Sequence, residues 1–112
     1  MATALATEAT RLNERYGLTD SAIARATGAA RSTARAWIAG TREPSGERAE
    51  RLIELAAICE RLELVMERDY IGIWLRKPIP ALEDEKPLDL IARGDYLPVA
   101  RVVSALEDPG AI

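Results

Sequence analysis

Apolar residues recur at three- and four-residue spacing along most of the chain, and the strict alternation typical of strands is missing. In the first 40 residues this pattern predicts three short helices, over residues 2–16, 20–27 and 31–39. Each is followed by a glycine (Gly17, Gly28 or Gly40), which suits the left-handed turn after a helix. Thr19 is a favourable N-cap for the second helix. The spacing therefore predicts an all-α fold.

The rest of the pattern predicts one long helix and then shorter ones. The long helix begins after Ser45 as its N-cap and extends to about Arg68. Its middle is apolar on nearly every face, through Leu52, Ile53, Leu55, Ala56, Ile58 and Cys59. Such a helix lies either between other elements or at a subunit interface, and the second possibility predicts a homodimer. Shorter helices are predicted over residues 69–75 and 88–93 and from Asp95 to the tail at residues 108–112, with a proline-rich loop over residues 76–87.

Residues 18–44 have the order helix, glycine turn, helix, which is typical of a helix-turn-helix. The second helix of this unit has an apolar side formed by Ala34, Trp37 and Ile38. Because Trp37 shares this side with aliphatic residues, we expect it to pack in the core rather than to stack on a base.

The opposite side of the same helix carries Arg31, Ser32 and Arg35, at the place where a DNA groove would lie. Arginine can bind guanine edges or phosphates, and serine can donate or accept a hydrogen bond. In the following loop, Arg42 suits a phosphate contact. These residues are the predicted DNA-binding set. The alternative is that the arginines only solvate an exposed helix.

Charge divides the chain unevenly. The 112 residues have a formal charge of −3 and a pI near 5.0, which argues against an indiscriminate nucleic-acid coat. Residues 1–51 have eight arginines and six acidic residues (+2), and residues 52–112 have seven basic and twelve acidic residues (−5). A mildly basic half joined to an acidic half indicates two surfaces with different partners. We therefore divide the chain into a DNA-binding region with its long helix, residues 1–68, and a second region, residues 69–112.

The residue inventory argues against most enzyme functions. The chain has no histidine and one cysteine, so a His/Cys metal site and a Cys–His dyad are excluded, as is an intrachain disulfide. The acidic run over residues 83–85 is typical of a hydrated loop, and neither a glycine-rich phosphate loop nor a nucleophile motif is found. We expect no enzyme, no cofactor and no metal, and Cys59 should be a small core residue. The lack of a signal peptide or a membrane-length apolar run predicts a cytoplasmic protein.

About forty residues follow the DNA-binding unit, and many of them are apolar. They suggest a dimer face or a protein partner, although they could also complete the core. Two segments resemble known families. LTDSAIARATGAARSTARAWIAGTREP resembles the Xre-like helix-turn-helix of phage-type repressors. WLRKPIPALEDEKPLDLIARGDYLPVARVVSALEDPGAI resembles the toxin-binding domain of the MbcA/ParS/Xre antitoxins, through Trp74-Leu75, a nearby proline pair, Leu82, Pro87-Leu88-Asp89-Leu90, Gly94 and Val99. In length and organisation the chain looks most like the shorter type, MbcA.

The resemblance implies an antitoxin that binds and inhibits a RES-domain toxin, an enzyme that consumes or uses NAD. It also implies repression of the antitoxin's own operon by binding operator DNA, and a C-terminal end that blocks NAD access to the toxin. The residues implied in toxin binding are Trp74, Leu82, Pro87, Leu88, Leu90, Gly94, Tyr96, Val99, Asp108, Gly110, Ala111 and Ile112. The alternative function is a stand-alone dimeric helix-turn-helix repressor. A small enzyme is a remote third possibility.

Overall fold

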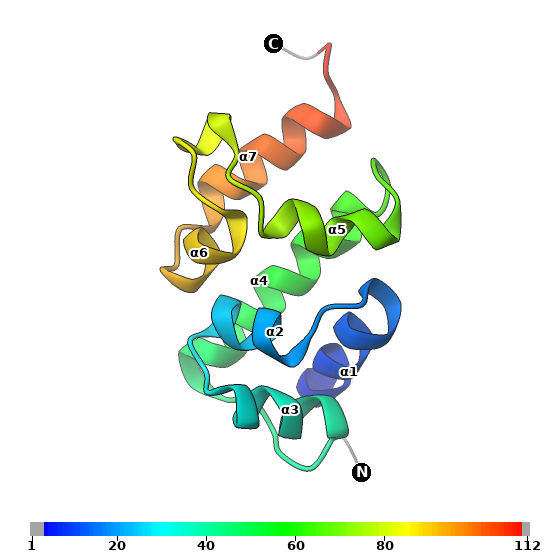
Figure 1. Cartoon of the computed structure of the whole chain (residues 1–112), viewed down its shortest axis with the longest axis vertical. Coiled ribbons are helices and arrows are strands. Elements are labelled where there is room, and N and C mark those ends of the chain that lie inside the picture. Colours follow the sequence, from blue (N-terminus) through cyan, green and yellow to red (C-terminus); the bar gives the residue numbers. More distant parts are fainter. Residues whose placement is uncertain (1–3, 111–112) are drawn as a thin grey trace.

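The computed structural model describes residues 4–110, which form seven α-helices and one short 3₁₀ helix (Figure 1). The first four are α1 (Ala4–Tyr16), α2 (Asp20–Thr27), α3 (Arg31–Ala39) and α4 (Gly46–Leu62). After them come α5 (Arg68–Leu75), η1 (Pro80–Leu82), α6 (Pro87–Ala92) and α7 (Tyr96–Glu107). The all-α prediction is confirmed.

Helix α4 is the centre of the molecule. It packs against α1, α2, α5, α6 and α7, and α2 also packs against α3 and α6. One hydrophobic core runs from Ala9 in α1 to Val103 in α7. The apolar circumference of α4 is therefore covered mostly by helices of its own chain, which is the first of the two alternatives that the sequence left open. The molecule measures 45 × 24 × 19 Å, and α3 lies at one end of its long axis while α7 and the following tail lie at the other (Figure 1).

The helix-turn-helix forms as its sequence predicts, because its boundaries are set by local interactions. Thr19 caps α2, since its Oγ1 accepts a hydrogen bond from the amide of Ala22 at 3.1 Å. Gly28 and Gly40 end α2 and α3 with φ of 77° each, a backbone conformation that glycine adopts without steric cost. The predicted bounds of both helices are confirmed.

The long helix is shorter than predicted. It ends at Leu62 rather than near Arg68, and residues 63–67 form a turn before α5 begins at Arg68. The cause is tertiary: Glu63, the first residue after α4, binds Arg15 and Tyr16 of α1. This interaction fixes the chain against α1 at the point where the helix would otherwise continue.

The predicted caps of the later helices also need correction. Ser45 and Asp95 occupy the N-cap positions of α4 and α7, but within residues 4–110 neither side chain makes a capping hydrogen bond. Pro87 is in the first turn of α6, where its missing N–H is tolerated. The predicted loop over residues 76–87 contains η1 and an isolated antiparallel bridge between Ile79 and Glu85. Among the described helices, none has the length and apolar character that crossing a membrane requires.

Candidate nucleic-acid and protein interfaces

Helix α3 presents the two sides that its sequence predicts. Trp37 and Ala34 are buried, which confirms that Trp37 is a core residue. Arg31, Ser32 and Arg35 are exposed on the outer surface, and the two arginine side chains are each 65% accessible. Helix α3 itself lies at one end of the molecule (Figure 1). The predicted DNA-binding side chains are therefore together on one accessible face, and their contact with DNA stays a prediction.

Asp20 binds both of these arginines, and the sequence analysis missed this contact. Nε of Arg31 donates to Oδ1 of Asp20 at 3.0 Å, and Nε of Arg35 donates to Oδ2 at 3.0 Å. Burial of the carboxylate would raise its pKa, but the hydrogen bonds from Arg35 and Arg31 outweigh burial and lower the pKa of Asp20. One signal could have found it: in a helix-turn-helix the start of α2 lies beside the start of α3, and Arg31 and Arg35 are one helical turn apart.

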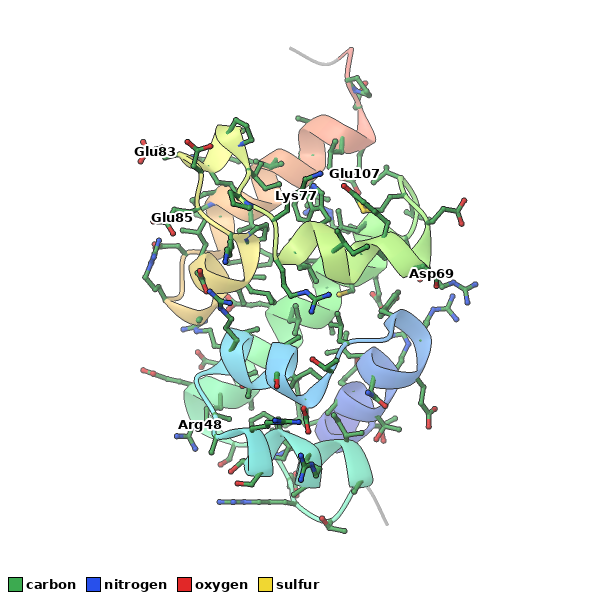
Figure 2. All side chains as sticks on the ribbon, in the orientation of Figure 1. Arg48, Asp69, Lys77, Glu83, Glu85 and Glu107 are labelled. Carbon is green, nitrogen blue, oxygen red and sulfur yellow. The ribbon has the colours of Figure 1, made fainter. Side chains whose placement is uncertain are left out.

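Two further arginines lie at the α3 end of the molecule. Nη1 of Arg42 approaches Oγ1 of Thr33 in α3 at 3.4 Å, so Arg42 folds back toward α3. Arg48 projects outward from α4 on the same half (Figure 2). The acidic side chains of Glu83 and Glu85 lie on the opposite half, beside α6 and α7 (Figure 2). The basic and acidic residues that the sequence separates therefore also lie on opposite halves of the molecule.

Half of the twelve predicted toxin-binding residues are buried in the core. The buried set consists of Trp74, Leu82, Pro87, Leu88, Leu90 and Val99. These residues complete the core, so a direct contact to a partner through their side chains is not available in this structure. Tyr96 is half-buried, and Gly94 is exposed after α6 with φ of 86°. Asp108 and Gly110 are exposed after α7, whereas Ala111 and Ile112 lie outside the described residues.

An apolar groove between η1 and α7 is the accessible surface that the sequence analysis missed. It has a volume of about 450 Å³ and is lined by Ala81, Pro98, Arg101, Val102, Ala105 and Leu106. Leu106 is 40% exposed in it. The signal was present in the sequence: Pro98, Val102 and Ala105 recur at helical spacing on a side of α7 different from that of the buried Val99 and Val103. An exposed apolar strip of this kind suits a protein contact.

The C-terminal end of α7 is fixed to α4 by one arginine. Nη2 of Arg61 donates to Oε1 of Glu107 at 2.6 Å and to Oγ of Ser104 at 2.9 Å. Nε of Arg61 donates to the second carboxylate oxygen of Glu107 at 3.2 Å. The hydrogen bonds from Arg61 lower the pKa of Glu107. The tail that begins at Asp108 therefore leaves the molecule from a fixed point next to the groove.

The remaining candidate chemistry is structural. Cys59 is fully buried, as predicted, and burial raises the pKa of its thiol to about 12, so it is a poor nucleophile. In the part of the chain that the structure describes, His, Cys, Asp and Glu side chains form no group of three or more that could hold a metal ion. The exposed arginine face and the apolar groove are the candidate sites to which the predicted functions direct attention, and both have the character of a surface for binding rather than for catalysis.

Comparison with known proteins adds three similarities. A helix-turn-helix family model matches residues 10–58. Curated proteins named mycobacterial cidal antitoxin MbcA, from Mycobacterium bovis and Mycobacterium tuberculosis, are 34% identical over 95 residues, which is 85% of this chain and 84% of theirs. A chain in the crystal structure of the M. tuberculosis MbcT–MbcA toxin–antitoxin complex matches with a TM-score of 0.84 and 31% identity, covering 99% of this chain and 100% of that chain. The similarity therefore includes both the helix-turn-helix and the helices that follow it.

Proposed function

This chain belongs to the family of MbcA antitoxins, which are not enzymes, and on that premise we propose that it binds a RES-domain toxin and inhibits it. The observation that carries this proposal is the match of nearly the whole chain to a chain of the MbcT–MbcA complex. In the family that the sequence resembles, the toxin consumes or uses NAD, and the antitoxin blocks access of NAD to its active site. We propose the same mode of inhibition here.

Residues 69–112 supply the toxin contact in this proposal, with the apolar groove of α7 as its exposed part. The predicted residues Trp74, Leu82, Pro87, Leu88, Leu90 and Val99 act from beneath this surface by holding η1, α6 and α7 in place. The tail from Asp108 to Ile112 fills the NAD cleft. The carboxylate of Asp108 can pair with an arginine that would otherwise bind a phosphate of NAD.

Deletion of residues 108–112 tests this division of labour. The truncated chain keeps Glu107 and therefore keeps the contact between α7 and Arg61. We expect the complex with the toxin to form, because its binding energy is spread over the larger surface, while the toxin in that complex consumes NAD. The measurement is NAD consumption by the purified complex. Full inhibition by the truncated chain would show that the tail is not the plug and would move the blockade to another segment, such as residues 76–87.

A second proposed function is binding of operator DNA, which would let the antitoxin repress its own operon. It is supported by the helix-turn-helix and by the common exposed face of Arg31, Ser32 and Arg35. Arg31→Ala should weaken operator binding by about 1–3 kcal/mol if the arginine reads guanine. Arg42→Ala should weaken binding to all sequences alike and reduce the salt dependence. Unchanged operator affinity of the Arg31→Ala, Arg35→Ala double variant in a gel-shift titration would contradict the assignment.

We also propose a homodimer, because two copies would present two recognition helices to an inverted repeat. Its support is the strip of α4 that the chain leaves uncovered, where Ile53 is half exposed and Ala57 is partly exposed. Light scattering at tens of micromolar protein, without a partner, should give twice the chain mass, and Ile53→Glu should reduce it to the chain mass. A monomer mass for the unmodified chain would count against the dimer.

A further inference from the structure

We propose that Asp20 is a positioning residue that gives the recognition helix its preference for guanine, by holding Arg31 and Arg35 in place before DNA arrives. This inference rests on the proposed DNA-binding function. Asp20 is in α2, whereas both arginines are in α3. One carboxylate thus connects the two helices of the helix-turn-helix at the surface that would face the bases.

One edge of each guanidinium binds Asp20, and the opposite edge is left to bind a base. Asp20 accepts from Nε of both arginines at 3.0 Å, and Nη2 of Arg35 also lies 3.0 Å from Oδ2. Nη1 points away from the carboxylate in a guanidinium held in this way. Arginine reads guanine with two parallel donors directed at O6 and N7, so a fixed orientation of the planar group determines whether both bonds can form.

The accessibilities of the three side chains support a role in orientation. The Asp20 side chain is only 16% exposed, whereas those of Arg31 and Arg35 are 65% exposed. An exposed arginine that is held at one end loses less conformational entropy when it binds a base. Ion pairs of exposed arginines contribute little to folding stability, so the main consequence of this contact should be on recognition.

The negative charge of Asp20 should also weaken DNA binding in general, and this second effect makes the positioning role testable. Asp20 lies beside the helix that would face DNA, and a carboxylate near phosphates weakens binding to every sequence. Removal of its charge should therefore strengthen non-specific binding while it weakens the preference for guanine. A residue that served only to support the fold would not change these two quantities in opposite directions.

The experiment uses the full chain and a duplex that this chain selects from random sequence, measured by fluorescence anisotropy at constant salt. Replacement of each guanine in turn by 7-deazaguanine removes the N7 acceptor. At the guanine that Arg31 or Arg35 reads, we expect the unmodified chain to lose about tenfold in affinity. Asp20→Asn should lose about threefold or less at that guanine and should bind a scrambled duplex at least as tightly as the unmodified chain. Asp20→Glu, which keeps the charge, should restore part of the guanine preference.

Glu43→Gln is the matched control, because Glu43 is an exposed acid in the loop directly after α3. It removes the same charge, so it should strengthen non-specific binding and keep the tenfold guanine preference. If Asp20→Asn keeps the full preference, or if Glu43→Gln loses it equally, the proposal is overturned. If the unmodified chain selects no sequence, the operator proposal fails, and this one fails with it for that separate reason.

If Asp20→Asn does not fold, the proposal can still be tested by an NMR measurement on the unmodified chain. Relaxation of the arginine ¹⁵Nε nuclei reports the order of each guanidinium on the picosecond to nanosecond scale. We expect Nε of Arg31 and Arg35 to be more ordered than Nε of the exposed Arg48. Equal disorder of all three in the free protein would overturn the positioning role.

Discussion

Glu63 is the residue at which three helices meet, and it makes the stability of the protein depend on pH. Its carboxylate accepts from Nε of Arg15 at 3.1 Å and from Oη of Tyr16 at 2.8 Å, and Nε of Arg68 lies 3.1 Å away. The hydrogen bond from Arg15, followed by that from Tyr16, lowers the pKa of Glu63 to about 2. The same contact acts on Tyr16: burial, and then the bond to Glu63, raise the pKa of its hydroxyl to about 12.

The lowered pKa determines the pH range in which this contact stabilises the fold. In the unfolded chain the carboxyl has its ordinary pKa of about 4.5, so it takes up a proton on acidification before the folded form does. Its contribution is therefore complete above about pH 4.5 and is lost as the pH falls toward 2. We expect Glu63→Gln to be less stable than the unmodified chain at pH 7 and equally stable near pH 2. Urea midpoints measured across this range test the convergence.

Glu14→Gln is the control for this measurement, because Glu14 is an exposed acid on α1. Its stability curve should run parallel to that of the unmodified chain over the whole range. A parallel curve for Glu63→Gln would mean that the contact with Arg15 and Tyr16 contributes nothing to folding.

At the scale of elements, local signals predict most of the helices, whereas the end of α4 coincides with a tertiary contact that the sequence does not reveal. The bounds of α2 and α3 follow from Thr19, Gly28 and Gly40, each of which acts within its own turn. The end of α4 has no such signal, because the residues after Leu62 include neither glycine nor proline until α5. That helix stops where Glu63 binds α1, and a contact between residues so distant in sequence leaves no local pattern.

The same difference between local signals and tertiary contacts explains which residues of the candidate sites could be predicted from the sequence. The apolar and charged sides of α3 could be separated because helical spacing sorts them. Most of the toxin-binding residues that the family resemblance implies are apolar, and apolar residues are first of all core residues. Trp74, Leu88 and Val99 are therefore buried. Helical spacing places Pro98, Val102 and Ala105 on one side of α7, but the groove also needs Ala81 of η1, and the packing of η1 on α7 is a tertiary contact without a local pattern.

The groove makes a prediction about α7 as an element. Leu106 lies in the groove and is 40% exposed, whereas Leu64 is 81% exposed on the turn between α4 and α5. Because both leucines are exposed, replacement by glutamate should leave folding intact in each case. We expect Leu106→Glu to weaken the toxin complex at least tenfold, because it places a charge in an apolar contact, and Leu64→Glu to leave it unchanged. Titration calorimetry with the purified toxin measures both. The reverse result would place the contact at the α4–α5 turn.

At the scale of the molecule, the proposed DNA-binding and toxin-binding regions share one core. Among the described aliphatic residues beyond residue 68, six are at most 1% exposed, namely Ile71, Leu75, Leu88, Ile91, Val99 and Val103. At about 1.5–3 kcal/mol for each buried side chain, their combined burial is comparable with the whole stability of a small domain, about 5–15 kcal/mol. We therefore expect residues 1–68 alone to lose the cooperative unfolding transition that the full chain shows. Thermal unfolding followed by circular dichroism tests this. A fragment that melts cooperatively near the full-chain temperature would show two independent folding units.

The two proposed binding surfaces lie far apart, so DNA and toxin should be able to bind one chain at the same time. The α3 face and the α7 end lie at the two ends of the 45 Å axis (Figure 1). A toxin at α7 should therefore not displace DNA from α3 by steric contact. One direct contact between the regions is the packing of α6 on α2, where Arg25 binds Asp89 through Nε–Oδ1 at 2.6 Å and Nη2–Oδ2 at 3.0 Å.

The Arg25–Asp89 pair is exposed, and exposed ion pairs contribute at most about 1 kcal/mol. It should therefore couple toxin binding to DNA binding only weakly. We expect saturating toxin to change the operator affinity of one antitoxin chain by less than about fivefold and to produce a slower band in a gel-shift assay rather than free DNA. By linkage, operator DNA should change the toxin affinity by the same factor. Asp89→Asn is the matched variant and should leave both affinities nearly unchanged. Release of the DNA by toxin from the unmodified chain, but not from Asp89→Asn, would contradict independent binding and identify the α2–α6 contact as the path between the two regions.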